Sequence, residues 1–238
     1  AALLPGDTGG KEIYMRINVH AGHNPAGKVA CGAVGLINES TENRRVKDEV
    51  ISKLRQLGHT VYDCTVDNGT GQTDVLKKII AKCNAHTVDL DVSIHFNSGS
   101  GDRDGNEKTT GVECYIYSST SKAKAFAEKI CQAISNLGFK NRGVKISQKL
   151  YVLKKSKAPA LLVECCFVDD KDDVQLYSYE EMADAIVYGI TGEHVQIVPE
   201  TSKAEQGEET STGDRKALYR VQVGAYTARY NAEAQAEK

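Results

Sequence analysis

The chain of 238 residues lacks several features that mark specialised classes of protein. Its 30 lysines and arginines nearly balance its 32 aspartates and glutamates, so the formal net charge is only -2. Such a balance excludes a general electrostatic attraction to nucleic acid or to an anionic membrane surface, so we expect no nucleic-acid partner. No run approaches about 18 consecutive apolar residues, which excludes a membrane-spanning segment and predicts no membrane insertion.

The cysteines do not form a disulfide framework. Their number, seven, is odd, none belongs to a C-x-x-C pair, and the chain is long enough to fold without disulfides. We interpret them as reduced thiols that pack like small apolar side chains, with a redox or ligand role as the alternative. Because no basic stretch leads into an apolar run near the start, we expect no secretion signal. Residues 1–14 precede the first methionine and are interpreted as a vector-derived leader.

Strand-like and helix-like patterns alternate from Met15 onward, and a glycine-rich loop over residues 22–35 follows the first short strand. Further strands are predicted over residues 59–66, 88–97, 111–118, 149–154 and 159–168. Amphipathic helices are predicted over residues 39–57, 73–86, 121–138 and 178–190. The alternation predicts an α/β fold, specifically a three-layer α/β sandwich whose central, mostly parallel twisted sheet is flanked by helices.

The pattern ends near residue 194, which predicts one domain over residues 15–194. Residues 195–217 are rich in Glu, Ser, Thr and Gly and show no apolar periodicity, so we interpret them as a polar linker. Residues 218–238 contain one alternating strand and the start of a helix, which is too little to build a core.

Two histidines differ from the other four in their context. His23 lies in the glycine-rich loop after the first strand, and His95 ends a buried strand, so both are expected at the carboxyl edge of the sheet. Glu39, at the start of the first helix, is expected to face the same edge. Two imidazoles and a carboxylate are one of the ligand sets of hydrolytic zinc. The residues alone leave open whether Glu39 is a ligand or an ordinary acid in the first turn of a helix.

Glu164 interrupts the apolar strand ALLVECCF, where a charge is costly unless it is paired or functional. One interpretation is a carboxylate that takes a proton from a zinc-bound water and passes it to a leaving amine. The alternative is a structural acid paired with a nearby lysine or arginine. The neighbouring thiols of Cys165 and Cys166 have no adjacent histidine to activate them as nucleophiles.

The ordered motifs from about Arg16 to Gly192 resemble the zinc-dependent N-acetylmuramoyl-L-alanine amidases of the Amidase_3 family. They are N-V-H-A-G-H-N, G-L-I-N-E-S-T-E-N, S-I-H-F-N, N-R-G-V-K, L-Y-V-L, P-A-L-L-V-E-C-C-F-V-D-D, D-V-Q-L and A-D-A-I-V-Y-G-I. This resemblance implies a peptidoglycan hydrolase that holds one Zn²⁺ through His23, Glu39 and His95. It also implies that Glu164 is the catalytic glutamate.

The resemblance further suggests substrate-orienting roles for Asn97 and Arg142. The chain departs from the family pattern at four places, where His20 stands for the usual Asp, Asn24 and Cys166 for Gly, and Asp170 for Asn. Residues 218–238 resemble the opening of a SPOR domain, a glycan-binding module. Only about a third of such a module is present, so this truncated segment is not expected to bind glycan.

The expected reaction is hydrolysis of the amide between N-acetylmuramic acid and L-alanine of the stem peptide. Two alternatives remain: a zinc peptidase that cuts within the stem peptide, and a non-catalytic wall-binding module. We expect synthesis in the bacterial cytoplasm and action on the cell wall after release or lysis. A phage endolysin and a bacterial sporulation or autolytic enzyme both fit this expectation.

Overall fold

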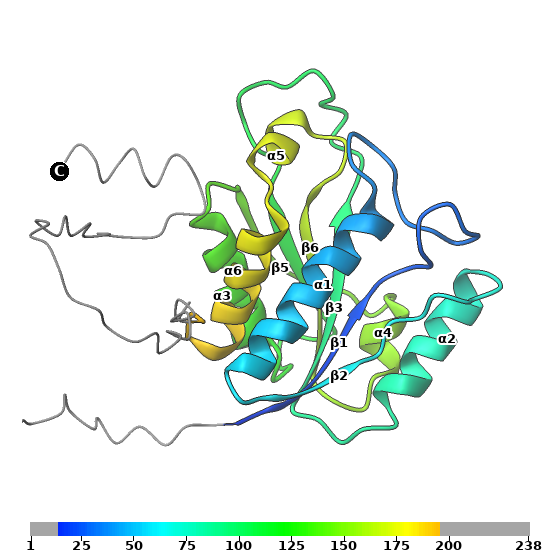
Figure 1. Cartoon of the computed structure of the whole chain (residues 1–238). Helices are drawn as coiled ribbons and strands as arrows, with labels where there is room; N and C mark the ends of the chain where they lie inside the picture. Colours follow the sequence, from blue (N-terminus) through cyan, green and yellow to red (C-terminus); the bar gives the residue numbers. More distant parts are fainter. Residues whose placement is uncertain (1–13, 196–238) are drawn as a thin grey trace, which may run out of the picture. The chain divides into compact units, whose positions relative to one another are not determined.

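The computed structural model of the protein describes residues 14–195 (Figure 1). The predicted leader, polar linker and SPOR-like segment lie outside these residues, except for Tyr14 and Val195. The described residues form a six-stranded sheet in the order β2-β1-β3-β6-β4-β5. The strands are β1 (Arg16–Ala21), β2 (Thr60–Asp63), β3 (Leu90–Asn97), β4 (Val112–Ile116), β5 (Asn141–Ile146) and β6 (Ala160–Phe167).

Helices cover both faces of this sheet, so the predicted three-layer α/β sandwich is confirmed (Figure 1). One face carries α1 (Glu39–Gln56), α3 (Lys124–Ser135) and α6 (Tyr179–Thr191), and the other carries α2 (Gln72–Cys83) and α4 (Tyr151–Lys155). A short helix, α5 (Lys171–Leu176), follows β6. The pairs β1–β2, β1–β3, β3–β6 and β4–β5 are parallel, and β4–β6 is antiparallel.

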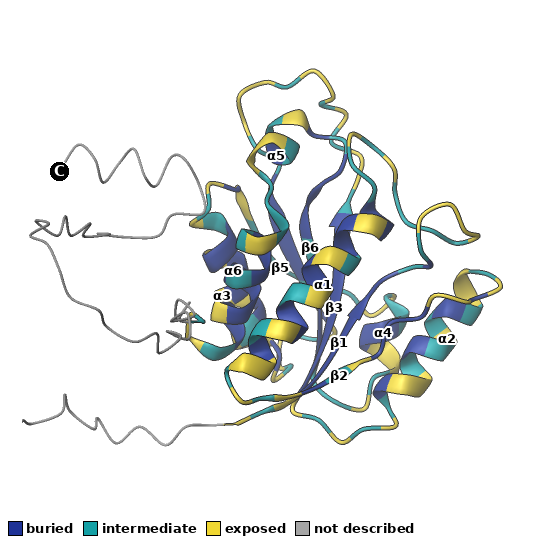
Figure 2. Cartoon of the chain, viewed as in Figure 1, coloured by how far each residue is buried: buried dark blue, intermediate teal, exposed yellow. Residues whose placement is uncertain are grey.

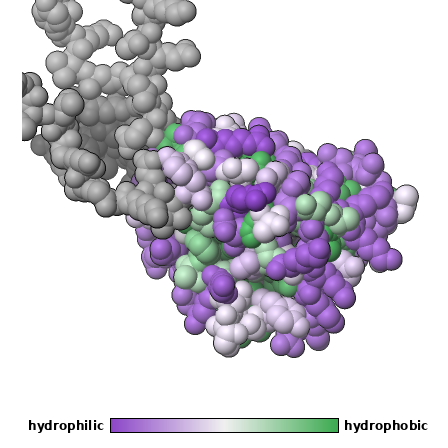
Figure 3. All heavy atoms as spheres, turned by 90° about the horizontal axis from the view of Figure 1, so that it is seen from below, coloured by the Kyte–Doolittle hydropathy of each residue, from purple (hydrophilic) through white to green (hydrophobic). Residues whose placement is uncertain are grey.

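The core lies where the sheet meets the helices, and the strands are buried while the outer sides of the helices are exposed (Figure 2). β3 and β6 occupy the centre of the sheet, which explains their nearly continuous apolar sequences. On the face seen in Figure 3, hydrophobic residues form separate areas between hydrophilic ones. Within residues 14–195, no helix combines the length and apolar character needed to cross a bilayer.

Two predictions of local structure were wrong. Residues 149–154 were predicted as a strand, but the chain there begins the one-turn helix α4, whose Val152 and Leu153 pack into the cluster beside α2. Six residues are too few to distinguish a period of two from one of 3.6. The segment around Arg142 was not among the predicted strands, but it forms β5, a half-exposed edge strand whose polar residues and glycine conceal the strand pattern.

Two irregularities in strand register lie side by side in the sheet. Between the pairs His95–Glu164 and Asn97–Phe167, one residue of β3 faces two residues of β6, namely Cys165 and Cys166. The β4–β5 pair has a similar shift opposite Glu113. Such β-bulges change the direction in which neighbouring side chains point and are frequent next to active sites. Both bulges adjoin the polar residues described next.

Candidate metal centre

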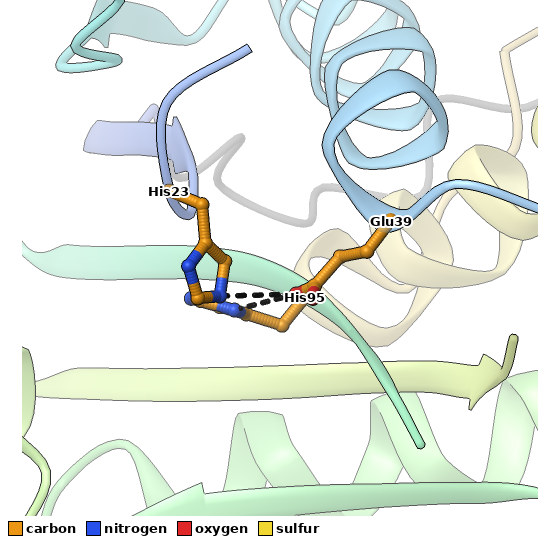
Figure 4. A group of neighbouring side chains, drawn as sticks. All are labelled: His23, Glu39 and His95. Carbon is orange, nitrogen blue, oxygen red and sulfur yellow. Dashed lines mark hydrogen bonds and ion pairs between the residues drawn. The ribbon is translucent and has the colours of Figure 1, made fainter. Parts of the chain in front are cut away.

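His23, Glu39 and His95 come together at the carboxyl edge of the sheet, as expected (Figure 4). His23 follows β1, Glu39 is the first residue of α1, and His95 lies on β3. Each offers one ligand atom, and these atoms all lie within 4.8 Å of one another. Glu39 Oε1 lies 2.9 Å from His95 Nδ1 and 3.4 Å from His23 Nε2.

The carboxylate of Glu39 is buried, and both of its oxygens accept hydrogen bonds from backbone N–H groups. Its Oε1 accepts a hydrogen bond from the backbone N–H of Phe96 (3.2 Å), and its Oε2 accepts one from that of Ala33 (2.8 Å). Burial by itself raises the pKa of Glu39, but the hydrogen bonds to His23 and His95 outweigh it and hold the pKa well below its usual range. Glu39 is therefore an anion between two imidazoles.

Two glycines make room for these side chains. A Cβ atom at Gly22 would lie 1.9 Å from His95 Cε1, and one at Gly32 would lie 2.3 Å from Glu39 Oε2. His23 itself has a φ of 62°, a left-handed conformation that is uncommon for a residue with a side chain. Backbone strain of this kind is concentrated at functional sites, where the surrounding contacts maintain it.

Two residues of α1 that the sequence reasoning missed hold the backbone beside His23. Asn43 Nδ2 donates a hydrogen bond to the carbonyl of Gly22 (3.0 Å), and Arg44 Nη2 donates one to that of His23 (2.9 Å). The signal for Asn43 was its position one turn after Glu39, on the same side of the helix. The burial of Asn43 became evident only in the tertiary structure.

Asn24, which stands for the usual glycine, also has a defined structural task. Its side chain donates to the carbonyls of Val29 and Gly69, each at 2.7 Å, and accepts from the N–H of Gly69 at 3.0 Å. The amide therefore joins the loop after β1 to the loop after β2. This departure from the family pattern supplies contacts that a glycine would not make.

Glu164 lies directly across from His95 in the β3–β6 pair. Its Oε2 is buried and has no hydrogen-bond partner among residues 14–195. Burial, followed by the charges of Glu39 and Glu113, raises the pKa of Glu164 well above its ordinary value. The predicted alternative of a structural ion pair finds no support here, because no lysine or arginine of the described residues pairs with Glu164.

Glu113 on β4 faces Glu164 from the other side and was missed by the sequence reasoning. Its Oε1 accepts hydrogen bonds from Asn97 Nδ2 (3.0 Å) and from the hydroxyl of Tyr115 (2.7 Å). Its Oε2 accepts one from Arg142 Nε at 2.6 Å. The structure thus joins Asn97 and Arg142 through one buried carboxylate. A charge inside the apolar strand VECYI was the available signal, the same signal that drew attention to Glu164.

The other departures from the family pattern also have structural explanations. His20 is buried, with Nδ1 3.5 Å from Ser93 Oγ, and burial together with His95 lowers its pKa to about 3, so the ring is neutral. Cys166 belongs to the bulge of β6 and packs in the core. Asp170 caps α5 by accepting a hydrogen bond from the N–H of Asp173.

A second group of possible metal ligands contains only carboxylates, from Asp102, Asp170 and Asp172. Oxygen-only ligand sets suit Mg²⁺ or Ca²⁺, whereas imidazole nitrogens suit zinc. The group around Glu39 is therefore the one whose donor chemistry fits zinc. A buried anion between two imidazole rings, with ligand atoms already gathered, matches the three protein ligands of hydrolytic zinc sites.

The chain is an α/β sandwich that gathers two histidines and a glutamate, a candidate set of metal ligands, at the carboxyl edge of its sheet. Residues 17–192 match the model of the N-acetylmuramoyl-L-alanine amidase family, Amidase_3. This match covers most of the chain, and the chain belongs to that family. The family resemblance predicted from the motifs is confirmed.

Similar proteins come from bacteria and a phage. An uncharacterised protein of Clostridium perfringens is 38% identical over 164 residues, covering 68% of this chain and 47% of the relative. The endolysin of Bacillus phage SPP1 is 29% identical, covering 71% of this chain and 60% of the phage protein. The chain spans about half the length of the curated relatives it matches first.

Among solved structures, the catalytic domain of the CD27L endolysin, which targets Clostridia difficile, has the same fold. The TM-score is 0.68 at 28% sequence identity, and the match covers 77% of this chain and all of that domain. The shared fold includes the mixed, mostly parallel sheet and its flanking helices.

Proposed function

We propose that the protein hydrolyses the amide between N-acetylmuramic acid and L-alanine in bacterial peptidoglycan, with one zinc ion held by His23, Glu39 and His95. Family membership supports this substrate and bond. The observation that carries the proposal is Glu164, a buried carboxyl group with an unpartnered oxygen, directly across from a candidate metal ligand. No structural ion pair among the described residues accounts for its position.

The residues of the site have separate roles in the proposed reaction. A zinc ion held by His23, Glu39 and His95 would supply Lewis-acid chemistry at the scissile amide. Glu164 accepts the proton of the attacking water and passes it to the departing amino group. Asn97 and Arg142 orient the substrate beside this carboxyl group, and Glu113 holds both of them in place.

The proposal places the catalytic domain at residues 15–194 and its action at the cell wall. A phage endolysin and a sporulation-specific amidase of Bacillus subtilis are both among the similar proteins. We propose that the enzyme reaches the wall on release or lysis. Residues 218–238 add no glycan binding in this proposal.

The test is digestion of purified peptidoglycan by the zinc-loaded protein and by its Glu164→Gln variant, with products identified by mass spectrometry. Wild type should release stem peptides with a free N-terminal alanine, and the variant should be slower by about 10²–10⁴-fold. Its zinc content should stay unchanged, because Glu164 is not one of the ligands. Glu128→Gln is the matched control, since Glu128 is exposed on α3.

The products also separate the alternatives. A peptidase that cuts within the stem peptide would leave alanine attached to muramic acid. A wall-binding module would release no soluble product from a zinc-replete preparation. Either result would refute the amidase proposal.

A further inference from the structure

We propose that Arg142 and Lys145 form a carboxylate-binding subsite next to the candidate metal centre, and that this subsite binds a free carboxylate of the stem peptide. The inference rests on the proposed amidase function. It specifies which group of the substrate Arg142 and Lys145 bind. Both residues lie on β5, next to the strand that carries Glu113.

Glu113 is the anchor of the subsite. Its side chain is only 2% exposed, and each of its two oxygens accepts two hydrogen bonds. Arg142 and Lys145 both donate to Oε2. Burial raises the pKa of Glu113, but the hydrogen bonds from Arg142, Lys145 and Tyr115 outweigh it and bring the pKa to about 2. Glu113 is therefore an anion at neutral pH, and the three charged groups together carry a net charge of +1.

Arg142 retains its capacity to bind a second carboxylate. Within residues 14–195 it donates a hydrogen bond from Nε alone, which leaves both terminal nitrogens of the guanidinium group without a partner. The guanidinium carbon of Arg142 lies 5.0 Å from the centre of the Phe167 ring, so a cation–π contact holds one face of the guanidinium group. When a hydrogen bond from Nε fixes the guanidinium group, its two terminal nitrogens can donate hydrogen bonds to both oxygens of one carboxylate.

The position of this pair suits a substrate group close to the scissile bond. Glu113 faces Glu164 across the β4–β6 pair, and Phe167 faces Asn97 across the β3–β6 pair. The bulge in β5 opposite Glu113 lies at Arg142 itself. The Arg142 side chain is 29% exposed and that of Lys145 is 39% exposed, so both are accessible from solvent.

Peptidoglycan offers a matching group. Its stem peptides continue after alanine with an acidic residue, whose α-carboxyl group is either free or amidated. A subsite with a net positive charge and unused guanidinium donors discriminates between these two forms, because only the free carboxylate accepts charge-assisted hydrogen bonds. A salt bridge that merely fastens the edge of the sheet would not discriminate between them.

The experiment compares two N-acetylmuramoyl tripeptides that differ only in this α-carboxyl group, free in one and a carboxamide in the other. Wild type should favour the free acid in kcat/KM by about tenfold or more. Arg142→Gln should bring this ratio close to one, because it should lower kcat/KM for the free acid far more than for the carboxamide. Arg142→Lys should retain part of the preference, because it keeps the charge but loses the planar fork.

Lys129→Gln is the matched control, because it removes one positive charge from the exposed side of α3 and should leave the ratio unchanged. Equal turnover of both substrates by wild type would overturn the subsite. A preference that persists in the double variant of Arg142→Gln and Lys145→Gln would overturn it too, and so would an equal loss on both substrates in Arg142→Gln.

A binding measurement separates failure of the subsite from failure of the proposed reaction. If wild type cleaves neither substrate, the amidase proposal fails, and titration calorimetry with the two free tripeptides still tests the subsite. Tighter binding of the acid form by about tenfold, lost in Arg142→Gln, would support the subsite. Equal dissociation constants would refute it.

Discussion

Replacing Asp91 by asparagine should stabilise the protein at pH 8 and have little effect at pH 4. Asp91 lies on β3 and is 3% exposed. Its Oδ1 accepts a hydrogen bond from Asn18 Nδ2 at 2.5 Å, whereas its Oδ2 is buried without a partner among the described residues. Burial raises its pKa from 3.8 to about 6, against the opposing effect of the Asn18 hydrogen bond.

The sign and size follow from proton linkage. Between pH 3.8 and about 6 the folded protein keeps a proton on Asp91 that the unfolded chain has released. The stabilisation is therefore fully present below pH 3.8 and is lost as the pH rises through about 6. A shift of about two pKa units corresponds to about 3 kcal/mol. Asparagine cannot ionise, so the variant should gain up to this amount over wild type at pH 8.

The assay is urea unfolding of wild type and Asp91→Asn across pH 4 to 8, with a chelator present so that metal binding adds no pH dependence of its own. Asp173, whose pKa burial also raises to about 6, titrates in both proteins and cancels in the difference. A difference in free energy of unfolding that does not change with pH would refute the reasoning. Lower stability of the variant at pH 8 would refute it as well.

Three further predictions concern the candidate metal centre. Gly22→Ala should weaken zinc binding by tenfold or more in a competition titration, because its Cβ would lie 1.9 Å from His95 Cε1; unchanged affinity would contradict this packing. Arg44→Met should weaken zinc binding by about 10–100-fold through loss of the hydrogen bond to the carbonyl of His23, while a variant with full affinity would show that this contact is dispensable. Cys166→Ala should cost about 1 kcal/mol of stability, because the thiol is buried, and should preserve zinc content and turnover. Loss of zinc from the folded Cys166→Ala protein would instead assign the thiol a ligand role.

Local patterns in the sequence determined a large part of this protein. The alternation of strands and helices predicted the α/β sandwich, because hydrophobic periodicity reports which side of each element is buried. His23 and His95 were located by the rule that the ends of parallel strands meet at one edge. Glu164 was found because a charge inside an apolar strand needs an explanation. These signals are contained in a few neighbouring residues, so no contact between distant segments was needed to read them.

Only the tertiary structure decided which distant polar groups meet. Glu113 takes its importance from Asn97 on β3 and from Arg142 on β5, and the strand order that joins them has no local signal. The antiparallel β4–β6 pair and the two bulges depend on packing across the whole sheet. The sequence by itself determined most of the elements and the family. The folded sheet decided how a buried carboxylate, two cations and the candidate metal ligands come to lie side by side, because hydrogen bonding between strands is a non-local interaction.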